Sequence, residues 1–131
     1  MSNEQREGPA VFKEILQSMN DQGDFKASVL AGSDGLPIAT VTSAYDTDTT
    51  AAMVARLQKV TQEAQEQLGM AEIDEVTIFD DTRLRLVCRH FTVNGERLIL
   101  AVMVPPYHYW RRLTNQAIQE IENRMGLSYV L

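Results

Sequence analysis

A run of seven apolar residues late in the chain, Leu98 to Val104, limits the possible folds more than any other feature. A strand of this kind has no polar side to turn toward water, so both of its faces must be covered. Asn94-Gly95 stands just before it, and both residues tolerate the positive φ of a tight hairpin turn. We therefore expect a central strand over residues 97–104, paired with a strand over residues 84–93.

The remaining chain divides into short elements separated by turn signals. We expect helices over residues 9–23, 50–68 and 107–126, and further strands over 25–31, 36–42 and 75–80. Pro37 favours an edge position for its strand, because proline cannot donate to a neighbouring strand. Strands that arrive as hairpins, separated by a helix, indicate an α+β domain with a mainly antiparallel sheet. We expect residues 1–8 to form a flexible N-terminal tail and residues 9–131 to form one domain. Its last residues, 127–131, are expected to be an apolar tail that packs on the body of the domain or on another chain.

The helix expected over residues 50–68 is the clearest amphipathic segment. Its apolar side chains recur at helical spacing along one stripe, namely Met53, Leu57, Val60, Ala64 and Leu68. It also contains several alanines, which permit close approach of a second helix. The strand that follows, over residues 75–80, is expected at an exposed sheet edge, and a free edge can pair with an identical strand. These features indicate self-association.

Composition excludes several classes of function. The 131 residues contain 12 Lys and Arg against 18 Asp and Glu, a net charge of -6, which disfavours binding to nucleic acid. One cysteine allows no intramolecular disulfide, and two histidines make a histidine-rich metal site unexpected. No apolar run approaches the roughly 20 residues that span a bilayer. We expect a cytoplasmic protein without direct membrane insertion.

Residues 46–50, Asp-Thr-Asp-Thr-Thr, have the spacing of the nucleophile loop of haloacid-dehalogenase phosphatases. In such a loop the first aspartate, here Asp46, attacks phosphorus, and the second, Asp48, acts as acid and base. The reaction also needs a buried strand before the loop and a later lysine, but only Lys59 follows, inside an expected helix. Aspartate and threonine commonly cap helices, so we favour a cap formed by Asp48 or Thr49.

Two further sets of residues have alternative interpretations. Cys88 and His90 share one face of a strand, but a mid-strand position favours a buried, inert thiol over a Cys–His nucleophile. Arg83, Arg85 and Arg89 could form an anion-binding face of a small-molecule sensor, but we favour their pairing with neighbouring acids, given the net charge of -6. No glycine-rich nucleotide-binding motif is found. We expect no catalytic, cofactor-binding or metal-binding residues, and hence no enzyme.

Residues 31–39, Ala-Gly-Ser-Asp-Gly-Leu-Pro-Ile-Ala, resemble the hairpin of Roadblock/dynein light chain domains. The resemblance continues through the alanine-rich helix of residues 50–69, the strand at Glu75 to Ile78, and the strand that ends in Pro105-Pro106. It implies a five-stranded, mainly antiparallel sheet with one helix on one face and two on the other, in the order α-β-β-α-β-β-β-α.

The same resemblance implies a homodimer formed through the third strand and the second helix. It also implies regulation or scaffolding of a Ras-like small GTPase, as in bacterial members of the MglB type, or a structural adaptor role without GTPase regulation. The expected dimer contacts are Val76, Ile78, Ala52 and Ala55. The expected partner contacts are Arg56, Lys59, Glu63, Glu66 and Gln67, for which simple solvation of the helix is the alternative role.

Overall fold

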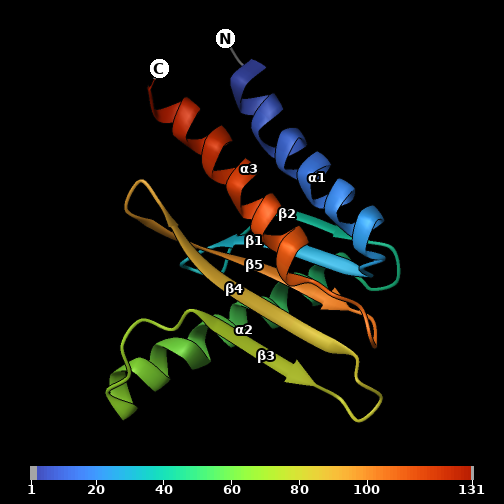
Figure 1. The fold of residues 1–131 in the computed structure, drawn as a ribbon. Coiled ribbons are helices and arrows are strands. Elements are labelled where there is room, and N and C mark those ends of the chain that lie inside the picture. Colours follow the sequence, from blue (N-terminus) through green and yellow to red (C-terminus); the bar gives the residue numbers. More distant parts are fainter. Residues whose placement is uncertain (1–2, 131) are drawn as a thin grey trace.

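The computed structural model describes residues 3–130 as an antiparallel sheet covered by helices on both faces. The elements are α1 (Asn3–Gly23), β1 (Ala27–Gly32), β2 (Pro37–Thr42), α2 (Thr47–Leu68), β3 (Glu75–Phe79), β4 (Arg85–Val93), β5 (Glu96–Val104) and α3 (Arg111–Val130). The sheet order is β2-β1-β5-β4-β3. Figure 1 shows α1 and α3 side by side on one face of the sheet and α2 on the other. The expected fold and element order are confirmed.

The central position expected for the apolar strand is also confirmed. In β5, Leu98, Leu100 and Val102 are at most 2% exposed and belong to the core beneath α1 and α3. The alternating residues Ile99 and Ala101 belong to a second, smaller core beneath α2. The two cores lie on opposite faces because successive side chains of a strand alternate. β2 and β3 form the two edges of the sheet, so Pro37 lies on an edge strand as predicted.

Several helix ends differ from the prediction. α1 already begins at Asn3, so residues 3–8, expected as part of a flexible tail, are helical and Pro9 lies inside the helix. α3 begins at Arg111 instead of Tyr107, whose φ of 64° is incompatible with a right-handed helix. It then continues through Gly126, since one glycine weakens a helix by only about 1 kcal/mol relative to alanine. The packing expected for the side chains of residues 127–131 lies outside the described part of the chain.

The hairpin between β1 and β2 is fixed against α2. The backbone N–H of Leu36 donates to the Asp34 carboxylate at 3.0 Å, and Gly35 adopts a φ of 82°. A Cβ added at Gly35 would lie 2.9 Å from the Cβ of Ala55, which is closer than real Cβ contacts. The turn therefore needs glycine for its backbone conformation and for its contact with the helix.

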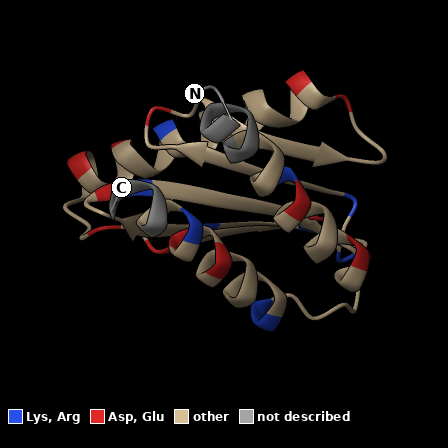
Figure 2. Cartoon of the chain, turned by 90° about the horizontal axis from the view of Figure 1, so that it is seen from above, with Lys and Arg blue, Asp and Glu red and all other residues tan. Residues whose placement is uncertain are grey.

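Charged residues do not separate the molecule into an acidic and a basic side. In the view of Figure 2, acidic and basic positions are interspersed on the helices. The net charge of -6 is thus spread over the surface, and local charge has to be judged from individual contacts. Of the helices described between residues 3 and 130, none has the length and apolar character needed to cross a membrane.

Candidate protein-binding surface

The helix α2 covers only part of its face of the sheet. It packs mainly on β1 and β2, and its buried residues are Ala51, Val54 and Thr61. The same face of β3 and of the start of β4 is left open. There Ile78 is 46% exposed, and Leu86 is half-buried.

Most of the apolar stripe of α2 is not buried in the core, although Leu57 packs against the smaller core beneath the helix. Met53, Val60 and Leu68 are 44%, 58% and 76% exposed, while Leu57 and Ala64 are half-buried. A stripe of this kind normally faces the core, because burial of apolar area is its main source of stability. Here it runs beside the open part of the sheet. We call the combined surface the α2–β3 face; its members are Met53, Leu57, Val60, Val76, Ile78 and Leu86.

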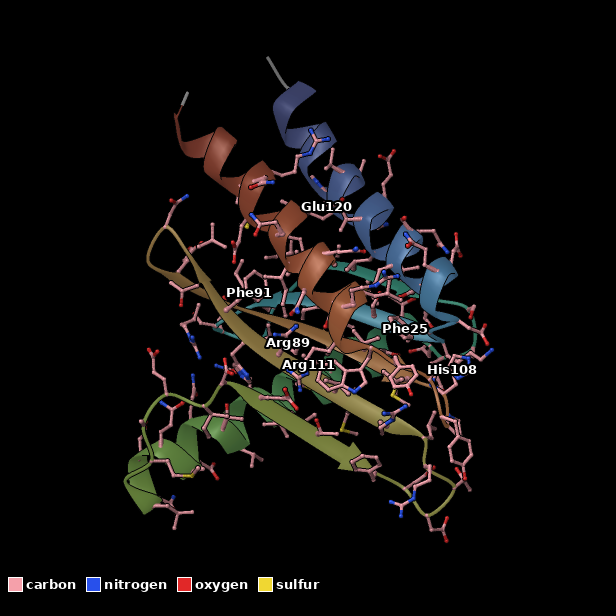
Figure 3. All side chains as sticks on the ribbon, in the orientation of Figure 1. Phe25, Arg89, Phe91, His108, Arg111 and Glu120 are labelled. Atoms are coloured by element: carbon pink, nitrogen blue, oxygen red, sulfur yellow. The ribbon has the colours of Figure 1, made fainter. Side chains whose placement is uncertain are left out.

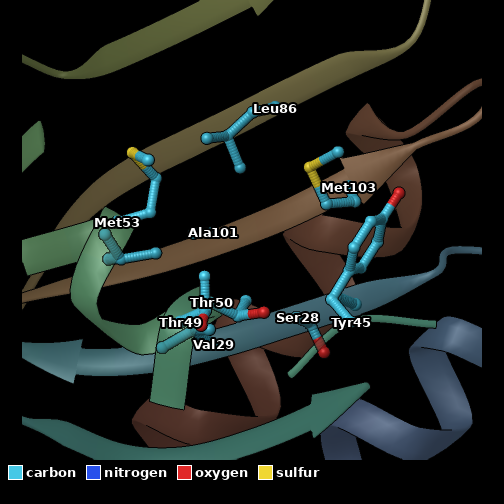
Figure 4. A pocket seen from close by; sticks show the side chains of 11 residues that line it. Ser28, Val29, Tyr45, Thr49, Thr50, Met53, Leu86, Ala101 and Met103 are labelled. Carbon is cyan, nitrogen blue, oxygen red and sulfur yellow. The ribbon is translucent and has the colours of Figure 1, made fainter. Parts of the chain in front are cut away.

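A groove of about 170 Å³ extends this face toward the start of α2. Figure 4 shows Tyr45, Met53, Leu86 and Met103 around it. The hydroxyl groups of nearby threonines are occupied in capping α2, and Ser28 Oγ has no hydrogen-bond partner in the described part of the chain. The groove is therefore suited to apolar side chains rather than to a polar ligand.

The expected dimer residues fall into two groups. Val76 and Ile78 lie on the outer strand β3 and point to the α2 side of the sheet, since they pair with Cys88 and Leu86 of β4. Ala52 is exposed on α2. Ala55 instead contacts the hairpin of its own chain, and only part of its surface remains accessible.

The expected partner-binding residues lie together on the outer side of α2. All five are exposed, namely Arg56, Lys59, Glu63, Glu66 and Gln67. No salt bridge to another described residue involves the four charged members of this group. Their charges thus remain available to a partner.

The structure assigns Asp46 a capping role. Its carboxylate accepts hydrogen bonds from the backbone N–H of Thr49 at 2.9 Å and from the Thr49 hydroxyl at 3.0 Å. These bonds hold the pKa of the Asp46 carboxyl below its usual value, the backbone N–H having the larger effect. The helix cap is therefore Asp46, rather than Asp48 or Thr49. This geometry explains the motif as a helix start, with no need for a phosphatase nucleophile.

Cys88 and His90 point to the same face of β4, as the alternation predicts. Burial raises the pKa of the Cys88 thiol to about 12, so the thiolate that a nucleophile requires does not form near neutral pH. His90 Nε2 lies 3.0 Å from Oε1 of Gln58 on α2. Burial, together with the positive charge of Arg97, lowers the pKa of His90. The pair connects β4 to α2, and its environment does not favour nucleophilic chemistry.

The two arginines of β4 among these residues, Arg85 and Arg89, are held by neutral oxygens rather than by carboxylates, while Arg83 lies in the turn before the strand. Arg85 donates to the backbone oxygens of Pro105, at 3.1 Å, and His108. Arg89 donates to the Thr114 hydroxyl at 2.9 Å, beside Arg111 at the start of α3 (Figure 3). Arg83 makes no salt bridge within the described residues. The ion pairing expected as the simplest explanation is therefore wrong for these three residues.

Sequence reasoning missed a group of exposed aromatic side chains near the end of β3. Phe79, Tyr107 and Tyr109 are 53%, 88% and 94% exposed. They come from two segments more than 20 residues apart, the last residue of β3 and the β5–α3 loop. The only local signal was the pair of tyrosines directly after Pro105-Pro106.

An exposed apolar stripe beside a free strand edge defines a protein-binding domain. The sequence profile of the Roadblock/LC7 domain matches residues 11–82, more than half of the chain. The chain therefore belongs to the Roadblock/LC7 family, which confirms the resemblance seen in its sequence.

Solved structures share the fold. The gliding protein MglB from Thermus thermophilus is 18% identical with a TM-score of 0.67, covering 88% of this chain and 90% of that one. MglB from Myxococcus xanthus is 14% identical with a TM-score of 0.68, covering 92% and 89%. An MglB described as having a tetrameric arrangement is 19% identical with a TM-score of 0.68, covering 88% of each chain. No curated protein matches the sequence.

Proposed function

We propose that the chain is a homodimeric, non-catalytic binding module of the cytoplasm that regulates or scaffolds a Ras-like small GTPase. Membership of the Roadblock/LC7 family and the fold shared with MglB support a regulatory or adaptor role. The single observation that carries the proposal is that the exposed apolar stripe of α2 lies on the same face of the sheet as the apolar side chains of the edge strand β3. A lone subunit would leave both features in water.

The proposed dimer pairs the two copies of β3 in antiparallel fashion. Backbone groups of the free edge would then be satisfied, and the two sheets would become continuous. Val76 and Ile78 would meet their counterparts, with Ala52 allowing close approach of the helices and Ala55 contributing its accessible part. Such an interface is isologous, because each copy presents the same residues to the other.

Dimerisation would place two copies of the outer side of α2 next to each other. We propose that the GTPase binds this doubled surface through Arg56, Lys59, Glu63, Glu66 and Gln67. The surface carries both signs of charge, so complementary charges on the partner would set orientation and association rate. Regulation requires different affinities for the two nucleotide states, since a ligand with equal affinity shifts no equilibrium.

A binding measurement tests this proposal. The Ras-like GTPase encoded nearest to this chain in its host is loaded with GDP or with a non-hydrolysable GTP analogue and titrated by calorimetry. We expect the two affinities to differ by about tenfold or more, which corresponds to about 1.4 kcal/mol. Lys59→Glu should weaken the tighter complex by about fivefold or more, because it reverses a charge on the proposed surface.

Lys13→Glu is the matched control for that titration. It makes the same charge change at an exposed position of α1, on the opposite face of the sheet, and should leave the affinity unchanged. Equal affinities for both nucleotide states would contradict regulation and leave a scaffolding role. Absence of binding in either state would contradict the GTPase proposal altogether.

A further inference from the structure

A second groove of about 360 Å³ lies at the end of β3, between the β3–β4 turn and the β5–α3 loop. Its lining residues are Phe79, Arg83, Arg85, Tyr107, His108 and Tyr109. Phe79 pairs with Arg85 across the sheet, one residue after the pair formed by Ile78 and Leu86. Since side chains alternate along a strand, Phe79 points to the α3 side while Ile78 points to the α2 side. This groove is therefore separate from the α2–β3 face.

The groove combines exposed rings with arginines. The guanidinium carbons of Arg83 and Arg85 lie 5.7 and 5.8 Å from the centre of the Phe79 ring. Tyr107 and Tyr109 are almost fully exposed beside them. Aromatic residues and arginine are enriched in protein interfaces, and tyrosine and arginine are among the residue types that most often contribute a large share of the binding energy.

The positive charge of this groove is not neutralised within the described residues. Neither Arg83 nor Arg85 forms a salt bridge there, and Arg85 Nε is buried with no hydrogen-bond partner. The nearby carboxylate of Asp80 accepts three hydrogen bonds within its own turn, from Thr82 and Leu84. Asp24 lies near His108 and Lys26, at 3.8 and 3.7 Å. Two guanidinium groups thus lack a carboxylate in a protein of net charge -6.

Both loops that form the groove hold a lining residue in a rare backbone conformation. Arg83 has a φ of 78° and Tyr107 a φ of 64°, values that non-glycine residues seldom adopt. Such conformations cost free energy and persist where the surrounding structure enforces them, which is frequent in binding sites. The two loops therefore fix the backbone from which the arginine and the tyrosine extend into the groove.

We propose that this groove binds an acidic peptide segment of a partner protein. Carboxylates of the segment would pair with Arg83 and Arg85, and an apolar side chain between them would pack on Phe79 and the tyrosines. A free phosphate would leave the exposed rings unused. A nucleic acid would bring a long, dense row of phosphates against a protein of net charge -6, whereas a short acidic segment brings only a few carboxylates. A polypeptide with a few carboxylates around an aromatic residue fits both the unpaired arginines and the exposed rings of the groove.

The test is a chemical-shift titration of the isotope-labelled full chain with the capped peptide Glu-Glu-Phe-Glu-Glu. We expect shifts confined to residues 79–85 and 105–110, and an affinity that falls as salt is added. Arg83→Glu should weaken binding by about fivefold or more, because it reverses the exposed charge of the groove. Arg83→Lys should retain part of the affinity. Lys13→Glu, on α1, should leave it unchanged.

Several results would overturn the proposal. These are an equal response to the capped peptide Lys-Lys-Phe-Lys-Lys, tighter binding of inorganic phosphate or of a short oligothymidylate, and shifts on α2 instead of the groove. Unaltered affinity in Arg83→Glu would do the same, provided that signals far from the groove show the variant to be folded. Phe79 is the last residue of β3, so the titration uses the full chain in the oligomeric state that it has in solution. Arg83→Glu and Lys13→Glu leave α2 and Ile78 unchanged, so loss of peptide binding in Arg83→Glu is distinguishable from loss of the dimer or of GTPase binding.

Discussion

At the scale of single residues, burial decides the chemistry of Cys88. The side chain is 2% exposed and lies in the core beneath α2. Its pKa is raised to about 12 because the charged thiolate would lose its hydration, so the folded protein keeps the thiol protonated. Cys88 is close to a histidine in the sequence, but its buried position in the fold makes it unreactive.

We predict that a disulfide reagent modifies native Cys88 at least about 100-fold more slowly at mildly alkaline pH than it modifies the denatured chain.

The difference between the pKa of Cys88 in the folded and in the unfolded chain also predicts how the stability of the protein depends on pH. The unfolded thiol ionises from about pH 8.5 while the folded thiol does not, so the free energy of unfolding should fall as pH rises above that value. Urea titrations at several pH values measure this decrease in the free energy of unfolding. In Cys88→Ala the decrease should be smaller, because the contribution of the thiol is absent. Rapid modification of the native protein would contradict the assigned burial.

At the scale of elements, strand positions followed from the sequence more directly than helix ends. The run Leu98 to Val104 and the Asn94-Gly95 turn specify a central strand and its hairpin locally. Pro9 and Gly126 were misleading as helix boundaries, because both residues lie inside helices of the structure. The apolar stripe of α2 could also be predicted from the sequence. Its exposure to solvent could not, because the exposure depends on which strands the helix crosses.

The contact between the β1–β2 turn and α2 can be tested by comparing the same substitution at two glycines, one in this turn and one in the β4–β5 turn. Gly35→Ala and Gly95→Ala both place a Cβ at a φ near 80°, so both should destabilise the protein by about 1 kcal/mol. Only at Gly35 would the new Cβ meet Ala55, at 2.9 Å, whereas nothing lies within 4 Å of the one at Gly95. We expect Gly35→Ala to cost about 1–3 kcal/mol more, as in other overpacked sites. Urea unfolding of both variants measures the difference, and equal losses would show that α2 moves aside freely.

At the scale of the whole molecule, two surfaces lie on opposite faces of one sheet. The sequence indicated the first, because an edge strand and an amphipathic helix each leave a local pattern. The groove at Phe79 and Arg83 escaped sequence reasoning, since it forms only when the β3–β4 turn meets the β5–α3 loop. If both proposals hold, separate faces would allow one dimer to bind two kinds of partner at the same time.

The oligomeric state is the decisive property of the molecule, and Ile78 is the residue that tests it. We predict that the wild-type chain has twice its subunit mass of 14.8 kDa in light scattering, and that Ile78→Arg shifts it toward the monomer. Ile78 is 46% exposed in the single chain, so arginine can stay solvated there, whereas a paired β3 would bury its charge without a partner. Leu36→Arg is the matched control, because Leu36 is 66% exposed beside β2 at the opposite edge of the sheet. Unchanged circular dichroism would show that both variants fold. A dimer that survives Ile78→Arg, or a wild-type monomer, would contradict pairing through β3.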